Sequence, residues 1–284
     1  MGMLHYDFMQ RAFWAGGIIA VLASTLGVYL MLRRQALIAD MLSHVSLAGV
    51  AAGTYLHINP SLAGFVVAIL GAIAVEYVRR SYRTFSEVSV AIIMVCGLST
   101  AVVLMSLIKG TSKSLSSYLF GSVVAVNTSD LRIMILVAAA GALFFFFLRR
   151  PLYQISFDEE TAQTDGLPVK SISLLFSVMT GMIVSAAMPI VGVLLVSALV
   201  ILPAAIAVRI AYSFNAAILI ACAVGLAGVF SGLTASYRLN TPPGGTIALI
   251  LLVFLVSGVL LQKAILRVYR NRVKHESSIR NYYT

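Results

Sequence analysis

The sequence predicts an all-α polytopic membrane protein, and three observations support that class. Of the 284 residues, 60% are hydrophobic and only 11% are charged, whereas soluble domains carry about 25% charged residues. The mean hydropathy is +0.99. The apolar residues also occur in long runs, of the length that crosses a bilayer as a helix. A soluble all-helical protein is the alternative, but this composition cannot supply the polar surface that it would need.

These apolar runs predict eight or nine transmembrane helices in a single transmembrane domain that covers residues 1–284. The count is eight if either of the first two runs does not cross the membrane fully. The predicted spans are residues 11–32, 36–56, 60–78, 87–108, 131–148, 171–187, 190–209, 214–236 and 244–264.

A shorter apolar stretch, LSSYLFGSVVAV at residues 115–126, lies between the fourth and fifth spans. It is too short to cross a bilayer as a helix. We therefore expect a short re-entrant or interfacial helix here.

The positions of the basic residues predict the orientation of the chain. Cytoplasmic loops are enriched in lysine and arginine, and the basic clusters follow the first, third, fifth, seventh and ninth spans. This places the N-terminus outside and the C-terminus, with its basic tail at residues 265–284, in the cytoplasm. The net charge of +10 is thus accounted for by topology, and nucleic acid is not an expected partner. The clustered residues are Arg33, Arg34, Arg79, Arg80, Arg83, Arg149, Arg150, Arg209, Lys263, Arg267, Arg270, Arg272 and Lys274.

One cytoplasmic loop, residues 151–170, has the signals of a short helix. Asp158 is a favoured N-cap residue, and Glu159 and Glu160 would lie in the first turn, where the helix dipole favours acids. Gly166 is a usual helix stop. The expected exposed, acidic helix is either a docking element for a cytoplasmic partner or simply a capped linker.

A second unusual feature is an ionisable pair inside the second span. Asp40 and His44 are four residues apart, so they share one face of a helix. Such groups are costly in lipid and usually line a pathway or bind something. A carboxylate and an imidazole together suit zinc, or manganese with additional oxygen ligands. The alternative is that Asp40 caps the second helix and His44 bonds a backbone carbonyl.

Four segments resemble a known family. LRRQALIADMLSHVSLAGVAAG, LSSYLFGSVVAV, ISFDEETAQTDGLPV and VGVLLVSALVILPAAIAVRIA are similar, in this order, to segments of the zinc/manganese-type ABC importer permeases. The resemblance covers nearly the whole chain and is closest to the zinc-uptake branch of Gram-positive bacteria.

The resemblance implies a homodimeric permease in a bacterial plasma membrane that works by alternating access. A cytoplasmic ATPase dimer would bind below it, and an extracellular metal-binding lipoprotein would deliver the ion. Asp40 and His44 match the metal-coordinating residues of the family. The loop would be the coupling helix that docks on the ATPase, with Gln10 and Arg11 facing the binding protein. The coupling residues would be Phe157, Asp158, Glu159, Glu160, Ala162 and Gly166.

The chemistry expected of the chain itself is limited. It contains no GxxxxGK[ST] phosphate-binding loop, so a separate subunit must hydrolyse ATP. No permanently bound cofactor is expected, and Zn²⁺ or Mn²⁺ would be cargo. Two rivals to this hypothesis are an ATP-independent ion transporter, and an intramembrane metalloenzyme. The enzyme would need an HExxH-like cluster, which the four dispersed histidines do not form.

Overall fold

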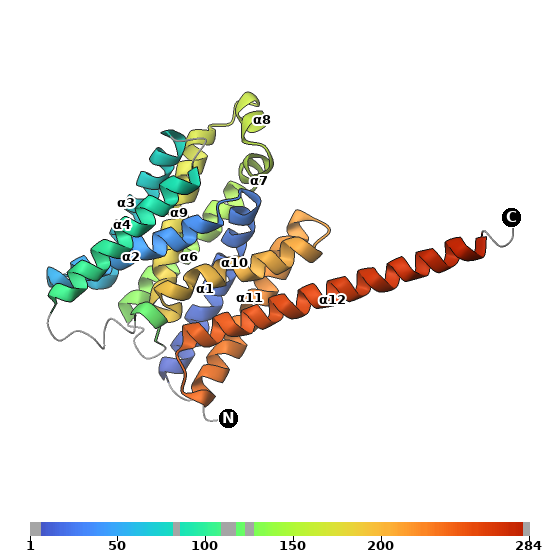
Figure 1. Cartoon of the computed structure of the whole chain (residues 1–284). Helices are drawn as coiled ribbons and strands as arrows, with labels where there is room; N and C mark the ends of the chain where they lie inside the picture. The colour runs from blue at the N-terminus through green and yellow to red at the C-terminus, as the bar shows by residue number, and fades with distance from the viewer. Residues whose placement is uncertain (1–6, 82–85, 109–117, 123–127, 281–284) are drawn as a thin grey trace.

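A computed structural model describes residues 7–81, 86–108, 118–122 and 128–280. In these ranges the regular structure is entirely helical, which confirms the predicted fold class (Figure 1). The helices are α1 (Asp7–Leu32), α2 (Ala36–Tyr55), α3 (Pro60–Ser81), α4 (Ser86–Leu107), α6 (Thr128–Phe147), α7 (Arg149–Phe157), α8 (Glu159–Thr164), α9 (Val169–Val191), α10 (Val193–Ile210), α11 (Phe214–Leu239) and α12 (Pro243–Arg280).

Within the described ranges, nine helices are long and apolar enough to cross a membrane. They coincide with the nine predicted spans, so the upper of the two predicted counts is confirmed. α2 and α9 are the most buried spans, while α4, α6 and α12 lie at the periphery of the bundle. The helix that carries Asp40 and His44 is therefore a central element of the chain.

Small residues allow α2 to lie close against α3. A Cβ atom on Gly49 would come within 2.7 Å of the Ala63 carbonyl oxygen and 2.8 Å of the Gly64 Cα. In lipid, where apolar side chains gain little by association, close backbone packing of this kind holds helices together. The pairing of α2 with α3 thus fixes the position of the polar face of α2.

A sharp break separates α9 from α10. Gly192 has φ 86° and ψ 150°, a combination that is accessible almost only to glycine. Residues 118–122 pack at this break, where the Ser122 N–H donates to the Pro189 carbonyl at 3.1 Å. Tyr118, Leu119 and Phe120 are helical, and Gly121 and Ser122 follow them. The other residues of the predicted re-entrant helix, 115–117 and 123–126, lie outside the described residues.

The loop at 151–170 contains two helices, where the sequence analysis expected one. α7 precedes the predicted acidic helix α8, and Leu152 and Ile155 on α7 are buried. The two helices separate at Asp158, whose extended backbone ends α7 and begins α8. α7 was not predicted, since its N-cap residue Leu148 makes no side-chain cap and the segment therefore carries no local start signal.

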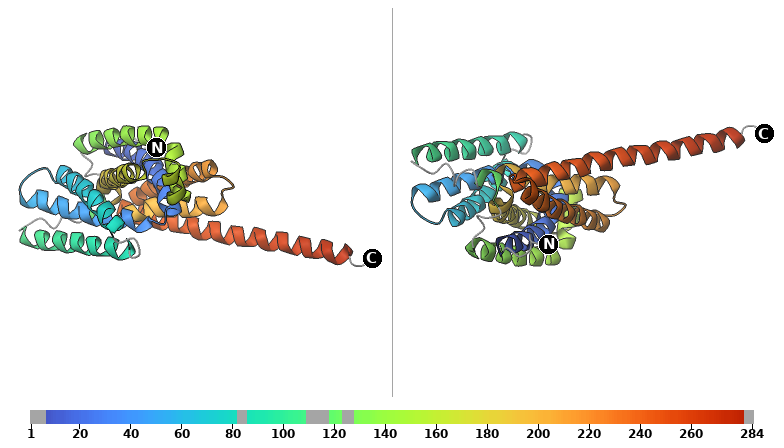
Figure 2. Two further views of the ribbon diagram at one scale, coloured as in Figure 1. Left: turned by 90° about the horizontal axis from the view of Figure 1, so that it is seen from above. Right: turned by 90° about the horizontal axis from the view of Figure 1, so that it is seen from below.

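The last helix is longer than its membrane span. The apolar part of α12 ends at Leu260, but the helix continues to Arg280. Its C-terminal half projects beyond the other helices, as the views from the side and from both ends show (Figures 1 and 2). The predicted basic tail is therefore helical over most of its length.

Candidate metal site and cytoplasmic docking surface

Asp40 and His44 lie on the same face of α2, as their spacing predicts. The helix begins at Ala36, so Asp40 is about 6 Å and His44 about 12 Å along the helix axis from its first residue. The His44 Nε2 and the Asp40 Oδ2 are 4.0 Å apart, with side-chain exposures of 11% and 31%. The pair is therefore partly shielded and close enough for both groups to contact one ion.

The alternative role of this pair, as a helix cap and a packed histidine, does not agree with the geometry. The N-cap of α2 is Gln35, and Asp40 lies within the helix. The Nδ1 atom of His44 is buried and has no hydrogen-bond partner among the described residues. A cation shared with Asp40 would bind the Nε2 atom that faces the carboxylate, and the buried Nδ1 atom would still need a hydrogen-bond partner of its own.

The nearby serines are already engaged in hydrogen bonds that hold α2 in place. The Ser43 hydroxyl donates to the Asp40 carbonyl oxygen at 2.7 Å. The Ser46 hydroxyl donates to the Gly64 carbonyl on α3 at 3.2 Å and lies 3.1 Å from the Ser185 hydroxyl on α9. Among the described residues, no three His, Cys, Asp or Glu side chains gather at one place. Within the described residues, Asp40 and His44 are thus a pair without a third candidate ligand of these types.

The helix α8 forms as predicted around an Asp158 cap. The Asp158 carboxylate accepts hydrogen bonds from the backbone N–H groups of Glu160 and Thr161, at 3.0 and 3.1 Å, and from the Thr161 hydroxyl. These bonds, mainly that of the hydroxyl, lower the pKa of Asp158. Gly166, at φ 85°, follows the end of the helix. The acidic first turn is exposed to solvent.

The residues expected to contact an ATPase do not all share one surface. Phe157 is 61% exposed beside Asp158, Glu159 and Glu160. Ala162 is only 1% exposed and packs in the main hydrophobic core. The exposed surface therefore consists of Phe157 and the acidic first turn, and Ala162 instead anchors α8 to the bundle.

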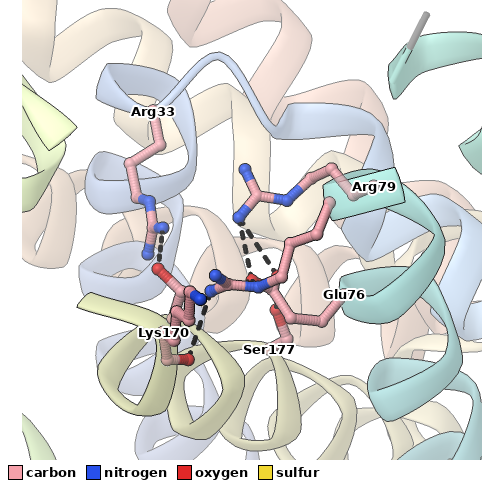
Figure 3. A network of polar contacts seen from close by, with 7 residues as sticks. Arg33, Glu76, Arg79, Lys170 and Ser177 are labelled. Carbon is pink, nitrogen blue, oxygen red and sulfur yellow. Dashed lines mark hydrogen bonds and ion pairs between the residues drawn. The ribbon is translucent and has the colours of Figure 1, made fainter. Parts of the chain in front are cut away.

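A polar network lies at the same end of the bundle and joins α3 to the start of α9 (Figure 3). The buried Glu76 carboxylate pairs with Arg79 and Arg80, at 3.0 and 2.7 Å. Arg80 also donates to the Lys170 carbonyl at 3.2 Å, and Arg33 donates to the Ser173 hydroxyl at 2.6 Å. The spacing of Glu76 from Arg79 and Arg80 on one helix predicts these ion pairs, and the structure confirms them. The long-range contacts with α9 follow from no local pattern in the sequence.

Arg33 is a largely buried cation of this network. Its guanidinium lies 4.8 Å from the centre of the Phe176 ring, within the range of a cation–π interaction. Burial is the main cause that lowers the pKa of Arg33 to about 10. The residue stays charged at neutral pH and holds the α1–α2 turn against α9.

The remaining candidate residues, Gln10 and Arg11, lie in the first turns of α1. Both are exposed, and they lie at the opposite end of the molecule from α8 (Figure 1). Their position is compatible with a partner on that side, but nothing in the geometry selects the partner.

A family model described as the ABC 3 transport family matches residues 5–262. The chain belongs to this family. As a member of the ABC 3 transport family it is a multi-pass membrane permease rather than an enzyme, and ATP hydrolysis is the task of a separate subunit. The family also implies a substrate-binding protein as a partner.

Individual members of the ABC 3 transport family match over most of their length. The manganese import system permease protein ScaB of Streptococcus parasanguinis is 32% identical over 89% of this chain and 90% of its own. The high-affinity zinc uptake system membrane protein ZnuB of Haemophilus influenzae is 27% identical over 86% of this chain and 94% of its own. The structure of PsaBC from Streptococcus pneumoniae in complex with Fab superposes with a TM-score of 0.81 at 29% identity, covering 90% of this chain and 92% of that chain.

Proposed function

We propose that the chain is the permease subunit of an ATP-driven importer of zinc. The observation that carries this proposal is the Asp40–His44 pair on the buried helix α2, whose Oδ2 and Nε2 atoms lie 4.0 Å apart. The names of the relatives, which include a manganese and a zinc transport protein, support a divalent transition metal as cargo.

The donor atoms favour zinc over manganese. An imidazole nitrogen is a good ligand for zinc, whereas manganese prefers a site rich in oxygen. The two neighbouring serine hydroxyls donate hydrogen bonds to backbone carbonyls, so Asp40 supplies the one carboxylate of the pair. Manganese is the second candidate, because the relative ScaB is named for manganese import.

We further propose that the working permease is a homodimer. One chain supplies two ligands from its described residues, and zinc sites usually have three or four protein ligands. A twofold axis near α2 would bring two aspartates and two histidines together. Such a site must open during each cycle, since tight four-ligand binding would trap the ion.

In the proposed cycle, the N-terminal end of the bundle faces outward and α8 faces the cytoplasm of a bacterium. A metal-binding lipoprotein delivers the ion outside, in contact with Gln10 and Arg11. ATP binding closes the ATPase dimer below α8. The movement of α8 then passes through α9 to α2, and the ion is released inward.

Metal uptake in cells that also contain the ATPase and the binding protein tests the proposal. The variants are Asp40→Ala and His44→Ala, with Ser43→Ala as the matched control on the same helix. We expect both ligand variants to lose radiolabelled zinc uptake at normal membrane expression, while Ser43→Ala keeps it. Loss of manganese uptake instead would identify manganese as the cargo.

Two results would contradict the proposal. Normal uptake of both metals in Asp40→Ala and His44→Ala would mean that the ion passes elsewhere. Metal transport by the purified chain in liposomes, without any ATPase, would favour the ATP-independent transporter.

A further inference from the structure

A groove lies between the N-terminal parts of α1 and α6, away from the Asp40–His44 pair. Its volume is about 560 Å³. One end is polar and the other is apolar. The lining residues are Gln10, Arg11, Trp14, Ile18, Leu131 and Ile135.

The polarity of the groove changes along α1. Arg11 lies near Met9, where the apolar span begins, and is exposed. Ile18 is seven residues further along, about 10 Å deeper into the span. On the other wall, Ile135 is 50% exposed. The groove therefore combines a cationic mouth at the membrane boundary with an apolar floor at the depth of the hydrocarbon.

Trp14 lies between these two ends and is 75% exposed. Tryptophan is enriched at membrane–water interfaces, because its ring is apolar and its N–H needs a polar partner. An exposed tryptophan one turn below an exposed arginine is the arrangement expected beside the headgroup and upper chain of a lipid.

We propose that this groove binds an anionic phospholipid, with the phosphate at Arg11 and an acyl chain along Ile18 and Ile135. Arginine is well suited to phosphate, because its planar guanidinium can donate two parallel hydrogen bonds. The lipoprotein of the proposed cycle would contact Gln10 and Arg11 from the aqueous side, but the apolar floor lies within the span, at a depth that a water-soluble protein does not reach. Of the nearby ionisable groups on α6, Asp130 is buried and Arg132 is exposed, and neither lines the groove.

The chain carries its own reporter for this site, because Trp14 is its only tryptophan. The full-length protein is placed in phosphatidylcholine nanodiscs that contain a minor fraction of brominated phosphatidylglycerol or, separately, of brominated phosphatidylcholine. Bromine quenches tryptophan fluorescence at short range, so quenching reports which lipid occupies the groove.

We expect equal quenching of Trp14 at about a fivefold lower mole fraction of the brominated anionic lipid than of the brominated zwitterionic lipid. This difference corresponds to the attraction of one basic residue to an anionic surface. Arg11→Gln should abolish this preference, and Arg11→Lys should retain most of it. Arg132→Gln, which removes an arginine outside the groove, should leave the preference unchanged.

Three outcomes would overturn the proposal. The first is equal quenching by both brominated lipids, and the second is an unchanged preference in Arg11→Gln. The third is protection of Trp14 from both lipids by the purified binding protein, which would assign the groove to that protein instead. Metal uptake plays no part in this readout, so failure of the lipid proposal and failure of the transport proposal are distinguishable.

Discussion

The hydroxyl of Ser177 on α9 donates a hydrogen bond of 3.1 Å to the carboxylate of Glu76 on α3. The same carboxylate is paired with Arg79 and Arg80 and is almost fully buried. These contacts tie the C-terminal end of α3 to α9, the helix that follows α8 in the chain. A buried carboxylate is tolerated only when its charge and its lone pairs are satisfied, and here both conditions are met.

Replacing this carboxylate with an amide should destabilise the bundle. We expect Glu76→Gln to lower the free energy of unfolding by about 2 kcal/mol, less than the roughly 3–5 kcal/mol of a fully buried pair. The loss is smaller because Arg79 and Arg80 are partly exposed and can turn to solvent. Denaturant-induced unfolding of the detergent-solubilised protein measures this difference.

Glu87→Gln is the matched control, since Glu87 is exposed in the first turn of α4. It should leave the free energy of unfolding within about 0.5 kcal/mol of the parent value. Equal stability of Glu76→Gln and the parent would show that the network contributes no net stability.

The acidic turn of α8 offers a test of the docking surface. We expect reversal of its charge, in the double variant Glu159→Lys and Glu160→Lys, to weaken association with the ATPase. Both side chains are exposed beside Phe157, so the change should act mainly on the interface, while the lost dipole interaction in the first turn of α8 costs about 0.3–1 kcal/mol per residue. Co-purification of the ATPase with the tagged permease measures the association.

Asp165→Lys places a reversed charge at the other end of the same helix and serves as the control. If the first turn is the contact, this variant should retain more ATPase than the double variant. Unchanged co-purification in the double variant would remove Glu159 and Glu160 from the interface, and the same test on Phe157→Ala would then decide whether α8 docks through its aromatic side chain.

The break between α9 and α10 should tolerate no side chain at Gly192. A Cβ atom there would lie 2.4 Å from the Gly121 backbone nitrogen and 2.5 Å from the Leu119 carbonyl oxygen. The backbone angles alone cost a non-glycine residue about 1–3 kcal/mol, and the contacts add to this. We expect Gly192→Ala to lower the thermal midpoint of the solubilised protein clearly.

Gly245→Ala provides the comparison for this prediction. Gly245 lies in the first turn of α12, and an added Cβ would meet nothing within 4 Å. Alanine also favours a helix over glycine by up to about 1 kcal/mol, so stability should be equal or higher. A Gly192→Ala protein as stable as Gly245→Ala would show that the break can adopt another backbone conformation.

The sequence by itself determined the positions of the membrane spans, because long apolar runs have few alternatives in a bilayer, and it left their number at eight or nine. It also determined the shared face of Asp40 and His44, since a spacing of four residues on a helix leaves no other arrangement. The cap at Asp158 and the stop at Gly166 followed from local hydrogen bonding and backbone preference. Each of these is a local property, set within a few residues of the chain.

The tertiary structure decided how these elements face one another. That Ala162 packs inward while Phe157 points to solvent depends on the position of α8 against the bundle. The engagement of Ser46 with Gly64 and Ser185, and of Ser177 with Glu76, joins residues that are far apart along the chain. The groove between α1 and α6 likewise requires two distant segments. Such contacts depend on helix packing, which is set by shape complementarity over many side chains and is not readable from any local pattern.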